Sequence, residues 1–343
     1  MAVLILSIET SCDETSAAVV TDGTSTSLGT RPEVLSNVIA SQTEFHKKYG
    51  GIVPEIASRK HIEVINLIIK EAMEKATKGF EDINAAAVTC GPGLVGSLLV
   101  GVCAAKAIAY SLNIPLIGVN HLEGHIYANF LSPSTPPPFP FICLMVSGGH
   151  TMIVEVKDHG KYKILGQTRD DAAGEAFDKV ARLLKLGFPG GPIIDKLAKE
   201  GNPHAVEFKR PMIEDEFKYD FSFSGIKTAV VNLVHRPSSI VPRIPDIVAS
   251  FQQAVVDVLV EKTIKAAQNK HINTICLAGG VSANSLLRSQ MLKQGEEAGL
   301  SVIIPPFEYT TDNAAMIGCA AYYKFINNKF SDLSLKPSAI LKL

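Results

Sequence analysis

The chain has 343 residues, of which 46% are hydrophobic and 20% are charged. This composition excludes an intrinsically disordered protein, and the length favours two domains over one. The formal net charge of −1 gives no global basic field, which argues against a general nucleic-acid-binding protein but is compatible with a local basic patch.

The cysteines and the apolar segments predict a cytoplasmic protein. The N-terminus has no basic region before its first apolar strand, and Gly, Lys or Pro interrupts each long apolar run, so neither a signal peptide nor a membrane span is expected. No two cysteines have CxxC spacing, so we expect reduced core residues rather than disulfides. The cysteines are Cys12, Cys90, Cys103, Cys143, Cys276 and Cys319.

The first predicted element is a β-hairpin over residues 5–20, "ILSIETSCDETSAAVV". An apolar run stops at a short polar stretch and small or β-branched residues then resume, which is typical of two strands joined by a tight turn. The turn holds two adjacent carboxylates, Asp13 and Glu14, where an ordinary turn uses Gly, Asn or Pro. Both are candidates for a functional role, and capping of the turn is the alternative.

The chain then repeats one order of elements twice. After the hairpin come a helix over about 54–78, the strand "AAAVTC" and a Gly-led helix and strand in "GPGLVGSLLVGVCAAKAIAYSLNIPLIGV". A second hairpin is predicted over 141–156, and a second Gly-led unit lies in "TICLAGGVSANSLLRSQMLKQGEEAGLSVIIPP". The Pro-rich segment 132–141 separates the halves as a stiff connector. The sequence therefore predicts two duplicated α/β lobes.

Duplicated lobes with small-residue turns at their strand ends predict a ligand cleft between them. Ligands in α/β sheets bind beyond the carboxyl ends of strands, where helix N-termini suit phosphate. The arrangement resembles the actin, Hsp70 and sugar-kinase (ASKHA) superfamily of ribonuclease-H-like lobes. That resemblance implies that the turns at 10–16 and 147–150 approach the phosphates of a nucleotide, although both are also compatible with ordinary hairpin turns.

A histidine pair in "NHLEGHIYANF" is a candidate metal site. Asn120 follows an apolar strand and suits the N-cap of a short helix, which places His121 and His125 on one helical face. Glu123 makes the pattern H-x-E-x-H rather than H-E-x-x-H, and it points away from the face that carries the imidazoles, so a metalloprotease is disfavoured. A solvated helix face is the alternative for the pair.

A third ligand is expected from Asp312 in "YTTDNAAMIG", which precedes a helix of small residues. Two imidazoles and one carboxylate with open positions suit iron(II) or zinc. An N-cap role is the alternative for Asp312, because aspartate is common at that position.

Further polar and glycine residues interrupt apolar segments in the second half. Asp178 and Asp195 lie on predicted helices and could accept hydrogen bonds from hydroxyl groups, while helix capping is the alternative for both. Gly191 is expected at a close backbone approach or a positive φ. Asn284 enters a helix after the glycine pair Gly279–Gly280, which could admit a base or ribose.

The chain closely resembles the TsaD family from end to end. The resemblance is carried, in family order, by "IETSCDETSAAVV", "GPGLVGSLLVG", "NHLEGHIYA", "LMVSGGHT", "GEAFDKVARLLKLGFPGGP", "FSFSGIKTA" and "LAGGVSANSLLR". It implies a tRNA-modifying acyltransferase that moves a threonylcarbamoyl group from threonylcarbamoyl-AMP to the N-6 amine of the adenosine after the anticodon, in tRNAs reading codons that begin with A.

The resemblance also implies the site residues. The metal ligands would be His121, His125 and Asp312, holding one divalent ion, iron(II) ahead of zinc. Asp13 and Glu14 would face the cleft and either order the substrate or accept a proton. The cleft would bind threonylcarbamoyl-AMP, and ATP or ADP could occupy the same place. The implied substrate-binding residues are Met145, Val146, Ser147, Gly148, Gly149, Asp178, Gly191, Asp195 and Asn284.

The domains and partners follow from the same resemblance. Residues 1–118 would form the N-terminal lobe, residues 119–324 the C-terminal lobe with the metal and most substrate residues, and the tail over about 325–343 would pack back on the first lobe. Expected partners are tRNA, the paralogue TsaB and the ATPase TsaE, and no membrane. Basic residues at 58–61 and 207–211, together with Lys218 and Lys227, are candidates for a tRNA surface.

Two other functions fit parts of the sequence. An ATP-dependent small-molecule kinase of the same superfamily explains the lobes and the turns but gives His121 and His125 no role. A non-catalytic nucleotide-binding scaffold would be expected to lack the histidine pair and Asp312, and all three are present.

Overall fold

The computed structural model describes the chain in two compact units. Unit 1 comprises residues 1–136 and 305–343, and unit 2 comprises residues 137–304. The structure describes all residues except 1, 27–28, 132–135, 214–217 and 236–241. The first part of the Pro-rich connector, 132–135, therefore lies outside the described residues.

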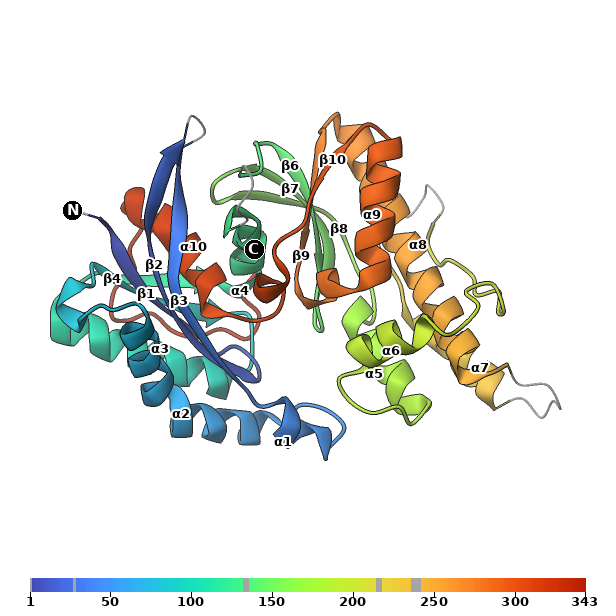
Figure 1. Ribbon diagram of the computed structural model, residues 1–343, viewed down its shortest axis with the longest axis horizontal. Coiled ribbons are helices and arrows are strands. Elements are labelled where there is room, and N and C mark those ends of the chain that lie inside the picture. Colours follow the sequence, from blue (N-terminus) through green and yellow to red (C-terminus); the bar gives the residue numbers. More distant parts are fainter. Residues whose placement is uncertain (1, 27–28, 132–135, 214–217, 236–241) are drawn as a thin grey trace. The chain divides into compact units, whose positions relative to one another are not determined.

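Unit 1 is built on a five-stranded mixed sheet in the order β3-β2-β1-β4-β5 (Figure 1). The predicted hairpin is present, because β1 and β2 pair antiparallel from Leu4 opposite Thr21 to Glu9 opposite Ser16. β4 pairs parallel with both β1 and β5. The strands are β1 (Leu4–Glu9), β2 (Glu14–Thr26), β3 (Gly29–Ser41), β4 (Ala85–Gly91) and β5 (Leu116–Asn120).

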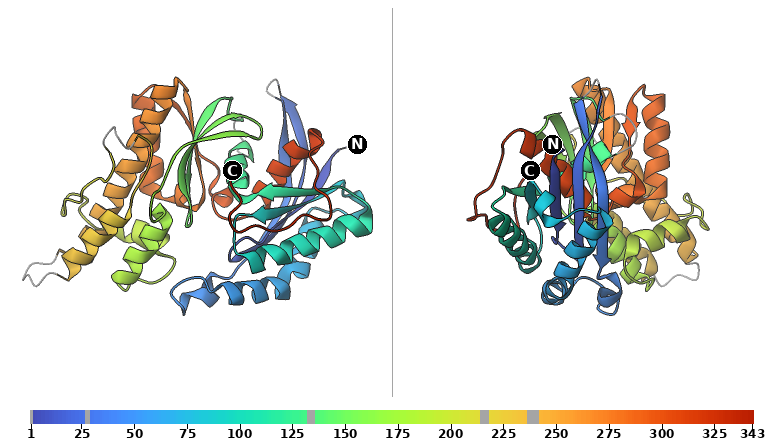
Figure 2. Two further views of the ribbon diagram at one scale, coloured as in Figure 1. Left: turned by 180° about the vertical axis from the view of Figure 1, so that it is seen from behind. Right: turned by 60° about the vertical axis from the view of Figure 1, so that its left-hand side comes forward.

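Helices cover both faces of this sheet (Figures 1 and 2). The side chains of β1 alternate, so that Leu4, Leu6 and Ile8 enter the apolar core with residues of α2 and α3. Between them, Ser7 faces α10 and donates its hydroxyl to the carbonyl of Ala314 at 2.7 Å. The helices of unit 1 are α1 (Thr43–Lys47), α2 (Pro54–Lys75), α3 (Val95–Leu112), α4 (His121–Tyr127) and α10 (Ala314–Ile326).

Unit 2 repeats the topology of unit 1. Its sheet order is β10-β9-β6-β7-β8, with an antiparallel β6-β7-β8 meander and parallel β6-β9 and β9-β10 pairs. The duplicated α/β architecture expected from the sequence is therefore confirmed. The strands are β6 (Phe141–Val146), β7 (Thr151–Asp158), β8 (Lys161–Gln167), β9 (Thr274–Ala278) and β10 (Ser301–Ile303).

The core of unit 2 joins its sheet to a long helix, α8. Alternate residues of β6, Ile142, Leu144 and Val146, lie fully buried in one apolar cluster with Phe251 and Leu259 of α8. The helices are α5 (Ala173–Leu183), α6 (Gly190–Ala198), α7 (Ser224–Val234), α8 (Ile244–Lys270) and α9 (Ser285–Glu297).

The bounds of the units differ from those expected from the sequence. Residues 119–136 and 305–324, which carry α4 and α10, belong to unit 1 rather than to the C-terminal lobe. The reason is packing, because α10 lies against β1 and β2 and also against α4. The C-terminal segment also lies on the sheet of unit 1. Ser331 forms a β-bridge with Leu116, and the Ser338 N–H donates to the carbonyl of Cys90 at 2.8 Å. The candidate metal ligands therefore all lie in unit 1.

Two expectations about apolar residues need adjustment. In the part of the chain that the structure describes, α3 is long and apolar enough to meet the length and composition criteria for a membrane span, a test that core helices of soluble proteins also pass. It packs against β4 and α2, and a third of its residues are buried. Four of the free cysteines are buried, but Cys12 is partly buried and Cys103 on α3 is exposed, so Cys103 is not a core residue.

Candidate functional site

The histidine pair lies on α4 as the sequence predicts. The Asn120 side chain caps this helix by accepting a hydrogen bond from the N–H of Leu122 at 2.9 Å. Both histidines are buried, with His121 8% exposed and His125 fully buried. A solvated helix face therefore does not describe them.

Asp312 lies beside both imidazoles. Its Oδ1 is 3.5 Å from His121 Nε2 and 3.2 Å from His125 Nε2. The N-cap of α10 is the next residue, Asn313, whose side chain accepts from the N–H of Met316. Asp312 is therefore not the cap of this helix, and its carboxylate is placed for another role.

The donor set fits a divalent metal ion. The three ligand atoms lie within 4.8 Å of one another, and ligands of a tetrahedral zinc-like ion, about 2.0–2.2 Å from it, lie roughly 3.3–3.6 Å apart. Neither ring nitrogen of buried His125 has a hydrogen-bond partner among the described residues, although Nε2 is close to Asp312. Buried polar atoms normally have partners, so the Nε2 atom of His125, which faces Asp312, suits a ligand of a shared ion.

A fourth residue, Glu9 at the end of β1, completes the surroundings of His121. Glu9 is fully buried, and its Oε2 lies 3.2 Å from His121 Nδ1. The sequence alone did not identify Glu9 as part of the site. The signal was a lone carboxylate closing an apolar strand, but its partner comes from a segment more than one hundred residues away.

The carboxylates around His121 raise the pKa of its imidazole. Burial lowers the pKa of His121, but the negative charges of Asp312 and Glu9 outweigh burial and raise that pKa to about 9. Below that pH the imidazole holds a proton that a metal must displace. We therefore expect apparent zinc affinity to rise about tenfold per pH unit between pH 7 and pH 9, with about one proton released per ion. Calorimetry in buffers of different ionisation enthalpy measures this release, and a pH-independent affinity would contradict it.

The turn residues Asp13 and Glu14 also lie in unit 1. Glu14 accepts a hydrogen bond from the hydroxyl of Ser41 at 3.2 Å, and the carboxylate of Asp13 is its negatively charged neighbour. Burial, together with the charges of Asp13 and Asp312, raises the pKa of Glu14 well above its usual range. Turn capping alone does not need two adjacent carboxylates.

Glu123 points away from the candidate metal, as the helix geometry requires. Its buried carboxylate forms an ion pair with Lys324 of α10 at 2.7 Å. Lys324 also donates to the carbonyl of Gly118 at 3.1 Å. Glu123 therefore connects α4, α10 and β5 and is not part of the metal-binding face.

The predicted substrate-binding residues 145–149 of unit 2 span the end of β6 and the turn that follows it. The side chains of Met145 and Val146 are fully buried, so only their backbone could meet a ligand. Ser147 closes the turn, with its N–H donating to the carbonyl of His150 and its hydroxyl accepting from the N–H of His150. Around Gly148 and Gly149 there is open space where a Cβ would lie.

The other predicted substrate residues of unit 2 support its framework. Asp178 accepts from the N–H of Gly190, and Asp195 accepts from the N–H and hydroxyl of Ser285, so each holds a helix N-terminus. Asn284 caps α9 and donates its amide to Gln252 at 2.9 Å. These contacts match the capping alternative for Asp178 and Asp195, and they leave any ligand contact as a prediction.

The expectation for Gly191 was wrong. Gly191 lies in α6, it is absent from the glycines with positive φ, and a Cβ there would meet open space. The close approach belongs to Gly190, whose Cβ would lie 2.6 Å from the carbonyl oxygen of Phe177. The two adjacent glycines have the same sequence signal, so only the packing of α6 on α5 distinguishes them.

Gly174 on α5 packs directly against the turn Ser147–Gly149. A Cβ at Gly174 would lie 2.6 Å from the carbonyl oxygen of Ser147 and 2.8 Å from Gly148 Cα, both backbone atoms. We therefore expect Gly174→Ala to displace this turn and to raise the KM for the substrate predicted to bind there about tenfold or more, with metal content unchanged. Gly225→Ala, where the nearest atom is 3.7 Å away, is the matched control. Equal kinetics for both variants would contradict this role.

Comparison with known proteins assigns the family. Residues 33–319 match the model of TsaD, tRNA N6-adenosine threonylcarbamoyltransferase. The chain belongs to the TsaD family. It is similar to the tRNA N6-adenosine threonylcarbamoyltransferases of Clostridioides difficile (strain 630), with 55% identity, and of Clostridium perfringens (strain ATCC 13124), with 54% identity; each alignment covers 99% of this chain and 98% of the relative. The resemblance inferred from the motifs is confirmed.

Solved structures agree on the fold. The HypF structure in its phosphate- and nucleotide-bound form matches with a TM-score of 0.64 and 14% identity, over 96% of this chain and 47% of that one. Component A of (R)-2-hydroxyglutaryl-CoA dehydratase from Acidaminococcus fermentans matches with a TM-score of 0.50 and 16% identity, over 94% and 98%. Both have the actin-like ATPase fold, which confirms the predicted ASKHA class. This TsaD chain is a tRNA-modifying acyltransferase, its substrate is tRNA, and a kinase is not favoured.

Proposed function

We propose that this TsaD chain transfers threonylcarbamoyl from threonylcarbamoyl-AMP to the N-6 amine of the adenosine that follows the anticodon, with one divalent metal held by His121, His125 and Asp312. The observation that carries the proposal is the convergence of these three ligand atoms in unit 1 of a TsaD family member. The acceptor tRNAs are those that read codons beginning with A. The nucleotide part of the donor is assigned to unit 2, through the loop Ser147–Gly149 and the residues around it.

The reaction requires an activated acyl group, because an exocyclic adenine amine is a weak nucleophile. The mixed anhydride with AMP supplies that activation, and the protein must position and polarise the carbamoyl carbonyl. When bound, a divalent ion supplies Lewis-acid polarisation of a carbamoyl or phosphate oxygen. Iron(II) is proposed ahead of zinc, because two imidazoles and one carboxylate are the ligand set of many iron(II) sites.

Glu14 is the proposed proton acceptor for the attacking amine, with the negative charge of Asp13 beside it. A carboxylate whose pKa is raised by burial and by neighbouring negative charge is a better base near neutral pH than an ordinary one. The N-6 amine loses a proton as the new carbamoyl–nitrogen bond forms and AMP leaves, so a nearby base is required.

The proposed partners are TsaB and TsaE, and the proposed location is the cytoplasm. Among the apolar residues of α2, Ile65, Ile68 and Ile69 are buried in the core. Ile62 is 65% exposed and Leu67 is 66% exposed on the same helix. These exposed side chains support a contact between α2 and a partner.

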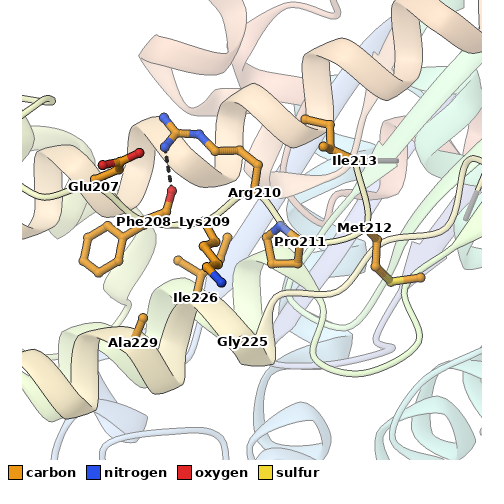
Figure 3. Close-up of a pocket in the computed structure, with 10 residues that line it drawn as sticks. All are labelled: Glu207, Phe208, Lys209, Arg210, Pro211, Met212, Ile213, Gly225, Ile226 and Ala229. Carbon is orange, nitrogen blue, oxygen red and sulfur yellow. Dashed lines mark hydrogen bonds between the residues drawn. The ribbon is translucent and has the colours of Figure 1, made fainter. Parts of the chain in front are cut away.

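The candidate tRNA surface is smaller than the sequence indicated. His61 is fully buried, Lys227 is paired with Asp171, and Arg210 is paired with Asp257 at 2.6 Å. Arg210 is one of the residues that line a pocket of about 480 Å³. Its guanidinium donates to the carbonyl of Phe208 (Figure 3). The guanidinium of Arg210 is therefore paired within unit 2, and we do not propose it as a phosphate contact.

Lys209 and Lys218 are both exposed and remain the proposed phosphate contacts. We expect the combined change Lys209→Glu and Lys218→Glu to weaken tRNA binding and to reduce the salt slope of log Kd by about one per lost contact. Metal content should stay unchanged. Charge reversal of the exposed pair Lys70 and Lys75 on α2 is the control, and equal salt slopes for the two double variants would move the RNA surface elsewhere.

A single reaction tests the proposed function. Purified chain is loaded with iron(II) or zinc and incubated with threonylcarbamoyl-AMP and unmodified tRNA, with and without TsaB and TsaE. The tRNA is then digested and its nucleosides are identified by mass. We expect threonylcarbamoyladenosine at the position after the anticodon, with multiple turnovers only when the partners are present. Modified tRNA formed from ATP, threonine and bicarbonate without the AMP ester would contradict the proposed donor.

A further inference from the structure

Glu9 has a more specific position than the end of a strand requires. Its carboxylate is fully buried, and each oxygen accepts a hydrogen bond: Oε1 from the N–H of Ser11 and Oε2 from the hydroxyl of Thr89 on β4. Oε2 is also 3.2 Å from His121 Nδ1. A buried carboxylate is costly unless its oxygens are satisfied, so three donors are gathered around this group.

We propose that Glu9 is the positioning residue that holds the imidazole of His121 with its Nδ1–H on the protein side and its Nε2 facing Asp312. Nε2 lies 3.5 Å from Asp312 Oδ1, on the candidate metal side of the ring. In a neutral imidazole only one nitrogen carries hydrogen, so a hydrogen bond donated by Nδ1 leaves the lone pair of Nε2 for a metal. The inference rests on the proposed metal site.

Ser11 is the competing partner of the same nitrogen. Its hydroxyl oxygen lies 3.1 Å from His121 Nδ1, so distance alone does not distinguish it from Glu9. A hydroxyl can either donate or accept, and it therefore fits both tautomers of the ring, whereas an ionised carboxylate only accepts. Glu9 is consequently the group that selects the tautomer.

The two histidines are held differently. His125 Nδ1 has no hydrogen-bond partner among the described residues, while His121 Nδ1 has two. His121 is thus the ligand with a fixed ring orientation, and His125 depends on the metal for its own. Loss of a partner that orients a ligating histidine typically lowers metal affinity about 10–100-fold.

The test measures zinc affinity of the full-length chain by competition with a chromogenic chelator. Glu9→Gln keeps the side-chain volume but replaces one carboxylate oxygen by an NH2 group, which cannot accept from the donors around Glu9. We expect zinc binding about 10–100-fold weaker. Ser11→Ala is the matched control and should change affinity less than about threefold. Thr89→Val, which removes one donor to Oε2 and leaves the carboxylate, provides a milder variant that tests the same contact if Glu9→Gln does not fold.

Nitrogen-15 NMR of histidine-labelled, metal-free protein at alkaline pH, where the imidazole is neutral, gives a second readout. The wild type should show hydrogen on Nδ1 of His121, whereas Glu9→Gln should lose this preference and Thr89→Val should weaken it. If His121→Ala binds zinc like the wild type, the metal site itself is wrong. If His121→Ala loses zinc while Glu9→Gln and Thr89→Val keep wild-type affinity and tautomer, or if Ser11→Ala alone weakens binding, the role of Glu9 is overturned and the metal site stands.

Discussion

Alanine at His121 or Asp312 is expected to abolish both metal binding and threonylcarbamoyl transfer. Each change removes one of three ligand atoms that lie within 4.8 Å of one another, and two remaining ligands make a weak site. We expect bound metal to fall from about one ion per chain to less than about a tenth, and the transfer rate to fall at least about a thousandfold. Elemental analysis and nucleoside mass analysis of the same samples measure both.

The control for this prediction is His204→Ala, which removes an exposed histidine of unit 2. It should retain both metal and activity. Circular dichroism and thermal unfolding of each variant separate loss of the ligand from loss of the fold. Transfer at the wild-type rate by His121→Ala or Asp312→Ala, with metal removed, would refute the proposed site.

Methionine at Lys324 is expected to destabilise unit 1 by about 2–4 kcal/mol, because it leaves the Glu123 carboxylate buried without its cation. The side chains of Lys324 and Glu123 are 24% and 7% exposed, so the carboxylate is the more buried partner. Lys324 also holds the carbonyl of Gly118, which adds a second lost contact. Urea unfolding of the metal-free protein, followed by circular dichroism, measures the change in the free energy of unfolding.

The double variant Glu123→Gln and Lys324→Met distinguishes the unpaired charge from lost packing. Without a charged carboxylate, the double variant should regain about half or more of the stability lost in Lys324→Met. Lys75→Met, in an exposed pair with Glu71 on α2, is the control and should cost less than about 1 kcal/mol. Equal costs for Lys324→Met and Lys75→Met would show that the buried pair contributes no more than a surface one.

Local patterns in the sequence predicted most of the sheets. The alternation of apolar and small residues around 5–20 and 141–156 identified both hairpins, and the glycine-led segments identified the parallel units, because these signals act between neighbouring residues. The unit boundary could not be found in this way. Residues 305–343 return to the first sheet, and α10 packs there through Gly318 against Ser7 and Val20.

In the candidate site, too, the sequence predicted features set by local spacing but not those set by tertiary contacts. The i, i+4 spacing placed His121 and His125 on one face of α4, since helix geometry is local. The capping partners of Asp178 and the pairing of Arg210 with Asp257 depend on tertiary contacts, and the sequence carries no sign of them. Glu9 was visible as a polar interruption, but its contact with His121 exists only in the folded sheet.

The proposed site places one ion among His121, His125 and Asp312 in the active enzyme. Anomalous X-ray diffraction of active, metal-loaded crystals, recorded at the absorption edge of the bound metal, locates that ion. We predict one strong anomalous peak about 2.0–2.2 Å from Nε2 of both histidines and from a carboxylate oxygen of Asp312. A fully active enzyme whose metal peak lies elsewhere, or whose three residues surround no peak, would refute this metal site.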